Sequence, residues 1–299
     1  MSNYSPLRYP GGKSVLYPII SSVIQSSSIS HCIYVEPFAG GASIAWSLLA
    51  EGIVDTVIIN DADKAVYSFW RAIMESTQWF VDKINETPIT VDEWRKQRVI
   101  LRSTKKYSKE LGFAMFFLNR TNRSGILDAG PIGGYDQVGE YKIDCRFNKS
   151  TLIKKIIRIS TYRNKVKIYN KDIFSFLARY LPLEKRHSDI FIYFDPPYYE
   201  KGHRLYMNYF SSKDHERLKE AVEQLNCKWI MTYDDKNEIR ELYEYYQKFP
   251  FLINYSLSSK KKGGELMIFK DISCIPSPTV IDKLSKAVIF DNLGLEGIE

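Results

Sequence analysis

A carboxylate followed by two prolines and two tyrosines stands directly after a strongly apolar stretch. The run is Asp195-Pro196-Pro197-Tyr198-Tyr199, and it follows Ile190 to Phe194. Two prolines end a strand and fix the backbone, so a carboxylate, a carbonyl and an aromatic ring are held rigidly at a sheet edge. That set suits a planar base with an exocyclic amine: Asp195 and the Pro196 carbonyl accept its N–H groups, and Tyr198 stacks on the ring. The alternative is an ordinary proline-rich strand end.

A pair of glycines follows another apolar run. The segment Glu36-Pro37-Phe38-Ala39-Gly40-Gly41-Ala42 stands between a strand pattern and a helix pattern. Glycines at this point let the backbone turn tightly and approach a ligand at the carboxyl end of a sheet, where open α/β sheets bind nucleotides. A tight turn without any ligand needs the same glycines, so the pattern alone leaves both interpretations open.

Further carboxylates stand where other strand patterns end. Asp61 and Asp63 follow the glycines by about 20 positions, a placement suited to accepting hydrogen bonds from the ribose hydroxyls of an adenosine. Asp172 repeats this placement after a later strand, where it is suited to accept from an adenine amino group while Ile173 offers its backbone amide. Capping of a helix N-terminus explains each of these carboxylates equally well.

The segment Pro10-Gly11-Gly12-Lys13-Ser14 matches only part of a phosphate-binding P-loop. The full pattern requires a glycine at position 7, where the chain has Leu7, and no strand pattern precedes it. This argues against a nucleoside triphosphatase. Lys13 at a predicted helix start is suited to meet a ligand carboxylate, and a solvated lysine is the alternative.

Alternating strand and helix patterns predict an α/β fold with a mainly parallel sheet. The expected strands are 33–38, 56–61, 165–169, 190–195, 228–232, 249–257 and 265–269. The expected helices among them are 14–25, 42–51, 63–74, 173–180, 213–225 and 238–246. A lysine- and glycine-rich turn at 258–264 joins the last two strands as a hairpin, so one strand at the edge of the sheet is expected to run antiparallel.

A long insertion separates the second and third expected strands. It has helix patterns at 91–102, 106–118 and 149–163, around a middle part rich in Gly, Asp and Asn. So long a loop inside a compact domain is unusual unless it is functional. We therefore expect a catalytic domain made of 1–64 and 165–275, an inserted lobe at 65–164, and a C-terminal tail at 276–299 with one short helix and a loose end.

The formal charge of +7 is unevenly distributed along the chain. Residues 95–186 hold 22 Lys and Arg against 7 Asp and Glu, a local excess of +15, and the remainder carries −8. Such asymmetry predicts a lobe that binds a polyanion beside a domain with another task. A solvated basic face is the alternative.

Targeting and cysteine patterns narrow the class of protein. No run approaches the roughly 18 apolar residues of a membrane span, and the N-terminus lacks a signal-peptide core, so a soluble cytoplasmic protein is expected. The four cysteines are Cys32, Cys145, Cys227 and Cys274. They are widely scattered and form no CxxC pair, so we expect free thiols and neither disulfides nor a metal site.

Taken together, these segments make the chain resemble the Dam-type DNA adenine methyltransferases, in which the cofactor motifs precede the target-recognition region and the DPPY motif follows it. The resemblance covers roughly 5 to 270. It rests on Leu7 to Lys13, Glu36 to Gly41, Asn60-Asp61, Phe117-Leu118-Asn119-Arg120-Thr121, Asp195 to Tyr198, Phe210 to Leu218 and Glu265-Leu266. Several ordered motifs together are far more specific than any one alone.

The resemblance implies a Rossmann-like methyltransferase with a seven-stranded sheet, mostly parallel with one antiparallel edge strand, plus an inserted, mainly helical DNA-recognition lobe. It implies S-adenosyl-L-methionine as methyl donor, with S-adenosyl-L-homocysteine as product. The cofactor residues would be Tyr9, Lys13, Glu36, Phe38, Ala39, Gly40, Asp61, Asp172, Ile173 and Asp195. Tyr9 and Lys13 would lie near the methionine part, and Asp195, Pro196 and Tyr198 would hold a flipped adenine.

Double-stranded DNA is the implied partner, and no membrane contact is expected. The candidate DNA contacts are Asn119, Arg120, Asn122 and Arg123 near the bases, and Lys260, Lys261 and Lys262 on a phosphate. Two departures from the family pattern stand out. Ala42 replaces a common glycine, and the stretch from Arg123 to Arg146 differs from the usual recognition segment. A cognate restriction endonuclease, a solitary regulatory role and a phage origin all remain open, as does the oligomeric state.

Direct transfer of a methyl group to the 6-amino group of adenine is the favoured reaction. Methylation of a cytosine ring carbon requires a thiolate, usually from a Pro-Cys pair, and no cysteine here follows a proline. The exocyclic amine of cytosine and a glutamine amide in a protein would suit a similar pocket, and the basic lobe argues against the protein substrate. A DNA-binding relative without turnover is the non-enzymatic alternative.

Overall fold

A computed structural model of the chain describes residues 4–8, 13–27, 29–183, 189–199, 210–253, 263–276 and 288–290. Contacts between residues divide the chain into two compact units. The first unit comprises Met1–Gly12, Ala39–Ser47 and Ile59–Lys171, and the second comprises Lys13–Phe38, Leu48–Ile58 and Asp172–Glu299. The segment 65–164, expected from the sequence as an inserted lobe, lies wholly within the first unit.

The described strands form a mixed sheet. They are β1 (Ile33–Glu36), β2 (Thr56–Asn60), β3 (Val166–Tyr169), β4 (Ile190–Phe194), β5 (Lys228–Asp234), β6 (Gln247–Ile253), β7 (Gly263–Phe269) and β8 (Val288–Phe290). Their order in the sheet is β3-β2-β1-β4-β5-β7-β6-β8. The mostly parallel α/β sheet with an antiparallel edge is confirmed. The seven expected strands are present, and the described residues add an eighth, β8, within the tail that was expected to hold one short helix and a loose end.

The registers show how the strands of the second unit run. Strand β4 pairs in parallel with both β1 and β5. Strand β7 runs antiparallel to β5 and β6, and β8 runs antiparallel to β6. The predicted hairpin therefore joins β6 to β7, although most of its turn lies outside the described residues. The strand order reverses between β1 and β4, and in open α/β sheets ligands bind beyond the carboxyl ends of the strands at such a switch point.

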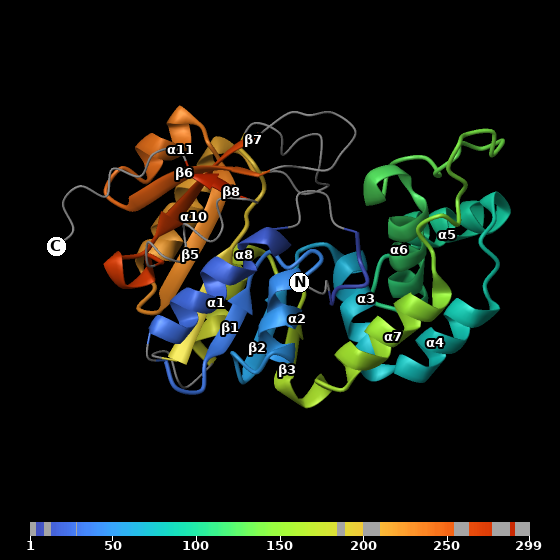
Figure 1. The fold of residues 1–299 in the computed structure, drawn as a ribbon, viewed down its shortest axis with the longest axis horizontal. Coiled ribbons are helices and arrows are strands. Elements are labelled where there is room, and N and C mark those ends of the chain that lie inside the picture. The colour runs from blue at the N-terminus through green and yellow to red at the C-terminus, as the bar shows by residue number, and fades with distance from the viewer. Residues whose placement is uncertain are drawn as a thin grey trace. The chain divides into compact units, whose positions relative to one another are not determined.

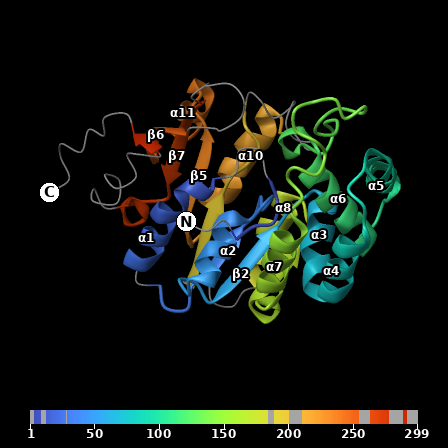
Figure 2. The same ribbon diagram turned by 45° about the vertical axis from the view of Figure 1, so that its right-hand side comes forward.

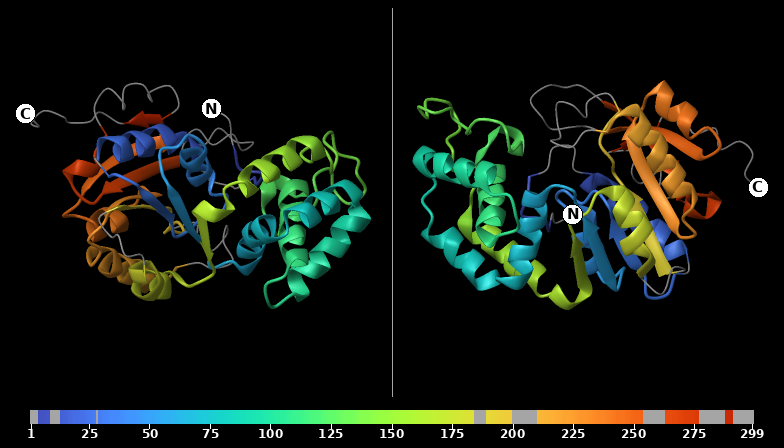
Figure 3. Two further views of the ribbon diagram at one scale, coloured as in Figure 1. Left: turned by 90° about the horizontal axis from the view of Figure 1, so that it is seen from below. Right: turned by 180° about the vertical axis from the view of Figure 1, so that it is seen from behind.

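Burial explains why the sequences of these strands are almost entirely apolar. Every residue of β1 and β4 is buried, as expected of parallel strands that are covered on both faces. Helix α1 (Tyr17–Ser26) covers one face, and α10 (Ser212–Glu223) covers the other (Figure 3). Figures 1 and 2 both show α10 lying along β5, and His215 of α10 hydrogen-bonds Tyr233 of β5 at 2.9 Å.

The remaining helices of the two units are shorter or belong to the lobe. Lys13 precedes a 3-10 turn at Ser14–Leu16, α2 spans Ser43–Ala50, and α8 (Ile173–Ser175) continues into a π-helical turn at Phe176–Tyr180, while α11 spans Asn237–Leu242. The lobe contains α3 (Lys64–Glu75), α4 (Thr77–Glu86), α5 (Val91–Ser103), α6 (Lys109–Thr121) and α7 (Lys149–Ser160). The sequence predicted these elements except α4, which follows α3 after the single residue Ser76.

Close packing in the first unit holds α6 against α3, and α4, α5 and α7 gather around this pair (Figure 1). A Cβ atom added at Gly112 would lie 2.5 Å from the Ser68 carbonyl oxygen, so only glycine allows this approach of the two helices. Phenylalanine rings fill the interior, with Phe69 stacked on Phe116 at 5.6 Å between centroids. The lobe therefore has a hydrophobic core of its own. Within the described residues, no helix is both long and apolar enough to cross a membrane.

Candidate active site

Four side chains converge at the carboxyl end of β4 in a group that we call the Lys13 cluster: Lys13, Asp195, Tyr198 and Glu265. The ammonium group of Lys13 donates to the Tyr198 hydroxyl at 2.9 Å and forms an ion pair with Glu265. It also lies 3.7 Å from an Asp195 carboxylate oxygen. Tyr198 in turn donates to Glu265 at 2.7 Å. The structure thus brings together three residues that the sequence predicted for the site, and it adds Glu265, which the sequence had marked only as part of a family motif.

The exposure of these side chains differs within the Lys13 cluster. The side chains of Lys13 and Glu265 are 2% and 3% exposed, whereas that of Asp195 is 26% exposed. Burial raises the pKa of both carboxyl groups, and the charge of Lys13 opposes the rise in each case. Lys13 therefore stabilises two carboxylates, of which Asp195 is the one open to a ligand.

A chain of two hydroxyl groups holds Asp195. Thr232 of β5 donates to Asp195 Oδ1 at 3.1 Å, and the Tyr193 hydroxyl lies 2.8 Å from the same threonine oxygen. Thr232 is fully buried and Tyr193 is 3% exposed. A carboxylate held by such partners keeps one orientation, which is the preorganisation that catalysis requires.

A group of partly exposed aromatic rings lies in the same unit. Phe38 contacts Phe210 edge-on at 5.9 Å between centroids, and Phe210 stacks on Phe174 at 6.3 Å. Asp172 is exposed and caps α8 by accepting from the Ser175 amide at 2.9 Å. Hydrogen bonds from the Ser175 side chain and amide lower the pKa of Asp172. Together the rings offer an apolar platform of the kind that binds a planar heterocycle.

The glycine turn belongs to the first unit and is built around Asp61. The Gly40 amide donates to Asp61 Oδ2 at 2.9 Å, and the Asp63 amide donates to Oδ1 at 2.8 Å. Trp70 fixes the turn from the other side, because its indole N–H donates to the Gly40 carbonyl at 2.9 Å. The backbone is left-handed at both Gly40 and Ala42, with φ of 44° and 45°. This explains why glycine suits position 42.

The environment of Asp61 is unusual for a carboxylate. Burial, reinforced by the nearby charge of Asp63, raises its pKa to about 7, while the amides of Asp63 and Gly40 oppose the rise. Each carboxylate oxygen accepts one backbone N–H and keeps acceptor capacity for a second donor. The arrangement fits a ligand that presents paired hydroxyl groups, such as a ribose. Asp63 caps α3 through the Ala65 amide at 2.7 Å, as the capping interpretation predicts.

Two of the residues predicted to contact bases form hydrogen bonds inside the protein. Asn119 donates to the carbonyls of Arg8 at 2.6 Å and Gly125 at 3.0 Å, and it accepts from the Arg8 amide at 2.8 Å. Asn122 accepts from the Trp94 indole at 2.6 Å and donates to two backbone carbonyls. Both asparagines are about 1% exposed or less. Their hydrogen-bonding groups are therefore used internally, and we withdraw them as candidates for reading bases.

The other predicted contacts differ in position. Arg123 is exposed, whereas Arg120 is partly buried and donates from its guanidinium to the Arg146 carbonyl at 2.7 Å. Tyr9 and the lysines Lys260, Lys261 and Lys262 lie outside the described residues, and their predicted roles stay predictions.

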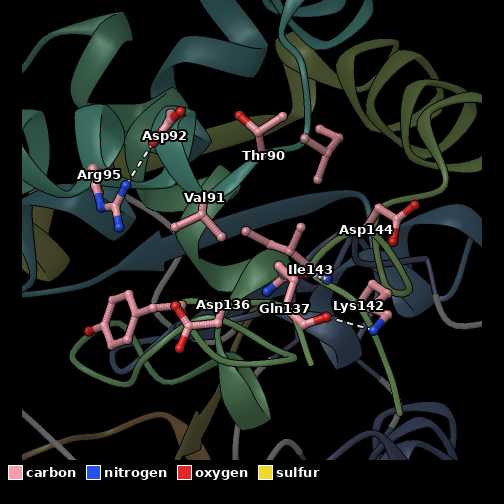
Figure 4. Close-up of a pocket in the computed structure, with 11 residues that line it drawn as sticks. Thr90, Val91, Asp92, Arg95, Asp136, Gln137, Lys142, Ile143 and Asp144 are labelled. Carbon is pink, nitrogen blue, oxygen red and sulfur yellow. Dashed lines mark hydrogen bonds and ion pairs between the residues drawn. The ribbon is translucent and has the colours of Figure 1, made fainter. Parts of the chain in front are cut away.

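The loop that follows α6 and its 3-10 turn lines a pocket of about 510 Å³ together with the start of α5 (Figure 4). Gln137 organises the loop, since its side chain donates to the carbonyls of Ile132 and Gly134 and accepts from the Ile143 amide. Apolar side chains of this loop stand in solvent: Val138 is 85% exposed and Tyr141 is 59% exposed. Exposed apolar groups on an ordered loop indicate a contact surface.

Comparison with known proteins places this geometry in a family. The family model of the D12 class N6 adenine-specific DNA methyltransferases matches residues 9–253. The chain belongs to this family. The matched range contains Asp195, Tyr198 and the glycine turn, and the family is one of adenine-specific DNA methyltransferases. The resemblance inferred from the motifs is confirmed.

Individual proteins that this D12 class methyltransferase matches have low sequence identity to it. The chain is 24% identical over 206 residues to the Type II methyltransferase M.MjaIII of Methanocaldococcus jannaschii, which covers 64% of the chain and 68% of that protein. Among solved structures it matches an uncharacterized protein from Listeria monocytogenes serotype 4b with a TM-score of 0.35 and 9% identity, over 86% of this chain and 67% of that one. It also matches the rRNA methyltransferase aviRa of Streptomyces viridochromogenes with a TM-score of 0.36 and 12% identity, over 83% of each chain.

Sequence reasoning missed several residues of the candidate site in this methyltransferase. Glu265, the third residue of β7, was noted only as part of a family motif and was given no role, although a single acidic residue in an apolar strand is a signal for one. Thr232 and Phe174 carried no such signal, because threonine in a strand and phenylalanine in a helix are ordinary residues at those places. Only the pairing of β4 with β5 brings Thr232 to Asp195.

Proposed function

We propose that the protein methylates the 6-amino group of an adenine rotated out of duplex DNA, at a specific site and by direct transfer from S-adenosyl-L-methionine. The observation that carries this proposal is the partly exposed Asp195 carboxylate, held by Thr232 and Lys13 at the switch point of the sheet. The Pro196 carbonyl follows it directly in the chain. The two acceptors match the two N–H groups of an adenine amine.

S-adenosyl-L-methionine supplies an electrophilic methyl group and leaves as S-adenosyl-L-homocysteine. Asp195 and the Pro196 carbonyl hold the amine by its N–H groups and turn its nitrogen lone pair toward the methyl carbon. As the nitrogen–carbon bond forms, the carbon–sulfur bond breaks, and the amine gives up a proton in the direction of Asp195. The raised pKa of Asp195 favours this role, since a more basic carboxylate accepts a proton more readily. No covalent enzyme intermediate is needed.

Binding of the methyl donor is assigned by the chemistry of each group. Within the first unit, Asp61 is the carboxylate suited to accept from ribose hydroxyls. Within the second unit, the platform of Phe38, Phe174 and Phe210 is suited to contact the adenine ring. Asp172 and the Ile173 amide serve its polar edge. Lys13 takes a different role from the one suggested by its sequence position: because its ammonium group is engaged by Tyr198, Glu265 and Asp195, it positions the catalytic carboxylate.

DNA binding is assigned to the basic residues of the first unit and to its ordered loop. The excess of +15 in residues 95–186 supplies attraction to phosphate. Arg123 and the exposed Tyr135, Val138 and Tyr141 are the side chains we assign to the vicinity of the target bases. A restriction endonuclease of matching specificity stays a prediction.

The test is transfer of labelled methyl groups to unmethylated DNA, followed by single-molecule sequencing. Wild-type protein should produce modified adenine in one short sequence context. Asp195→Ala should lose the activity while keeping its fold and much of its affinity for DNA, and Glu220→Ala, at an exposed carboxylate on α10, serves as the control. An active Asp195→Ala variant would overturn the assignment, and modified cytosine would identify the other exocyclic amine as the acceptor.

A further inference from the structure

Four cationic side chains gather in the first unit, in a group that we call the Arg120 cluster: Arg8, Arg120, Arg146 and Lys155. They come from four segments that are far apart in the chain. Arg8 lies in the N-terminal segment, Arg120 near the end of α6, Arg146 in the loop before α7, and Lys155 within α7. This group shares no residue with the glycine turn or with the Lys13 cluster.

Backbone carbonyl groups hold three of these side chains in place, and the fourth, Arg146, is exposed. Arg120 donates to the Arg146 carbonyl from two guanidinium nitrogens, Lys155 donates to the Ser5 carbonyl at 3.0 Å, and Arg8 donates to the Asn122 carbonyl at 3.3 Å. Among the described residues, no carboxylate forms an ion pair with any of the four. Each side chain retains N–H donors that these contacts do not use.

The hydrogen bonds bring the four segments next to one another: Arg8 reaches the carbonyl of Asn122 beside Arg120, Arg120 reaches that of Arg146, and Lys155 reaches that of Ser5. The directions of the pKa shifts agree with this arrangement. Burial lowers the pKa of Arg120 to about 10, and the charges of Arg8 and Arg146 add to this effect. The pKa of Arg8 is lowered by burial and then by Arg146, and that of Lys155 by burial and then by Arg120. Like charges held close together without a counter-charge repel one another and destabilise the fold. Binding of an anionic ligand would therefore reduce this repulsion.

The buried Asn119 explains how Arg8 is kept in this group. Its side chain accepts from the Arg8 amide at 2.8 Å and donates to the Arg8 carbonyl at 2.6 Å. These bonds fix the backbone of the N-terminal segment against α6. The cluster is therefore prearranged before any ligand arrives, which lowers the entropy lost on binding.

We propose that the Arg120 cluster is a binding site for one backbone phosphate of the DNA substrate. This inference rests on the proposed function. Planar guanidinium groups and an ammonium group match the charge and the several oxygen acceptors of a phosphodiester. A phosphate bound at a prearranged site fixes the register of the duplex on the first unit and carries no base specificity.

The experiment compares Arg146→Gln, Lys155→Gln and the control Lys154→Gln. Lys154 is the exposed neighbour of Lys155 on α7 and carries the same charge, so the control removes one charge outside the cluster. Affinity for an unmethylated duplex is measured by fluorescence anisotropy over a series of salt concentrations. Arg146→Gln and Lys155→Gln should each weaken binding about tenfold and reduce the salt slope by about one, and Lys154→Gln should stay within about twofold of wild type.

Thermal unfolding without DNA supplies a second readout. Because Arg146→Gln removes repulsion and keeps the backbone carbonyl that Arg120 uses, its Tm should equal or exceed that of the wild type, which separates lost DNA affinity from misfolding. Variants that bind DNA as Lys154→Gln does would overturn the proposal. A second result would also overturn it: inorganic phosphate raises the Tm of the wild type but not that of Arg146→Gln, and the two proteins bind DNA equally well. The site would then bind a free anion and not the DNA backbone. Failure of the wild type to methylate DNA would instead contradict the proposed function.

Discussion

Thr232 donates a hydrogen bond to Asp195 across the β4–β5 pair, with 3.1 Å between the two oxygens. Thr232→Val should reduce kcat about tenfold, because it removes a hydrogen bond to a charged group and frees the carboxylate to rotate. Thr232→Ser keeps the hydroxyl and should retain most of the activity. Single-turnover methyl transfer measures the effect, and the KM for the methyl donor should not change. Equal rates for the valine and serine variants would show that Thr232 only fills space.

The pKa of Asp61, raised to about 7, predicts a pH dependence of cofactor binding. Ribose hydroxyls need the ionised carboxylate as acceptor, so affinity for S-adenosyl-L-methionine should increase from about pH 6 to about pH 8 and then level off. Asp61→Asn should bind weakly at every pH and lack this increase. Calorimetric titration at several pH values measures it, and a parallel pH profile in wild type and Asp61→Asn would exclude Asp61 as its source.

The same group has the opposite effect on folding stability. Its folded pKa lies above the value of 3.8 taken for an unperturbed aspartate, so the folded state binds the proton more tightly. The stability that this proton contributes is fully present below the unfolded pKa and is lost as pH rises through about 7. In the absence of ligand, wild-type Tm should therefore fall with pH over this window more than that of Asp61→Asn.

The left-handed backbone of Ala42 predicts a stabilising substitution. At φ of 45° an alanine is strained, and Ala42→Gly should relieve this strain at a smaller entropic cost, for a net gain of up to about 1 kcal/mol. Ala45→Gly, in the regular part of α2, is the matched control and should lose about 1 kcal/mol. Urea unfolding of both variants measures the difference. A loss of stability in Ala42→Gly would mean that the methyl group packs with more benefit than the strain costs.

The buried ion pair between Lys13 and Glu265 predicts strong coupling between the two residues. Lys13→Met leaves a carboxylate buried without its cation and should cost about 3 to 5 kcal/mol. Glu265→Gln should also destabilise, and the double variant should be less destabilised than the sum of the single variants. Denaturant unfolding of the four proteins gives the coupling energy. Additive effects would show that the pair contributes no net interaction.

Local sequence signals were sufficient where a function depends on neighbouring residues in the chain. The two prolines after β4 mark Asp195 and Tyr198, and the glycines mark the turn, because backbone geometry at those points is set by the residue types themselves. The apolar runs likewise predicted seven of the strands and most helices. The eighth strand escaped prediction because it is only three residues long and is stabilised by pairing with β6.

Residues whose roles depend on distant partners were not predictable in this way. Asn119 and Asn122 stand in a motif that indicates DNA contact, yet their amides are used by Arg8, Trp94 and nearby carbonyls. The sequence by itself determined the fold class and the family, and it marked Asp195 as the candidate carboxylate. Only the tertiary structure decided that Lys13 is paired with Glu265, that Thr232 holds Asp195, and that four cations gather with no carboxylate paired to them in the described part of the chain. The reason is that hydrogen bonds and charge interactions depend on distance in space and not on separation in the chain.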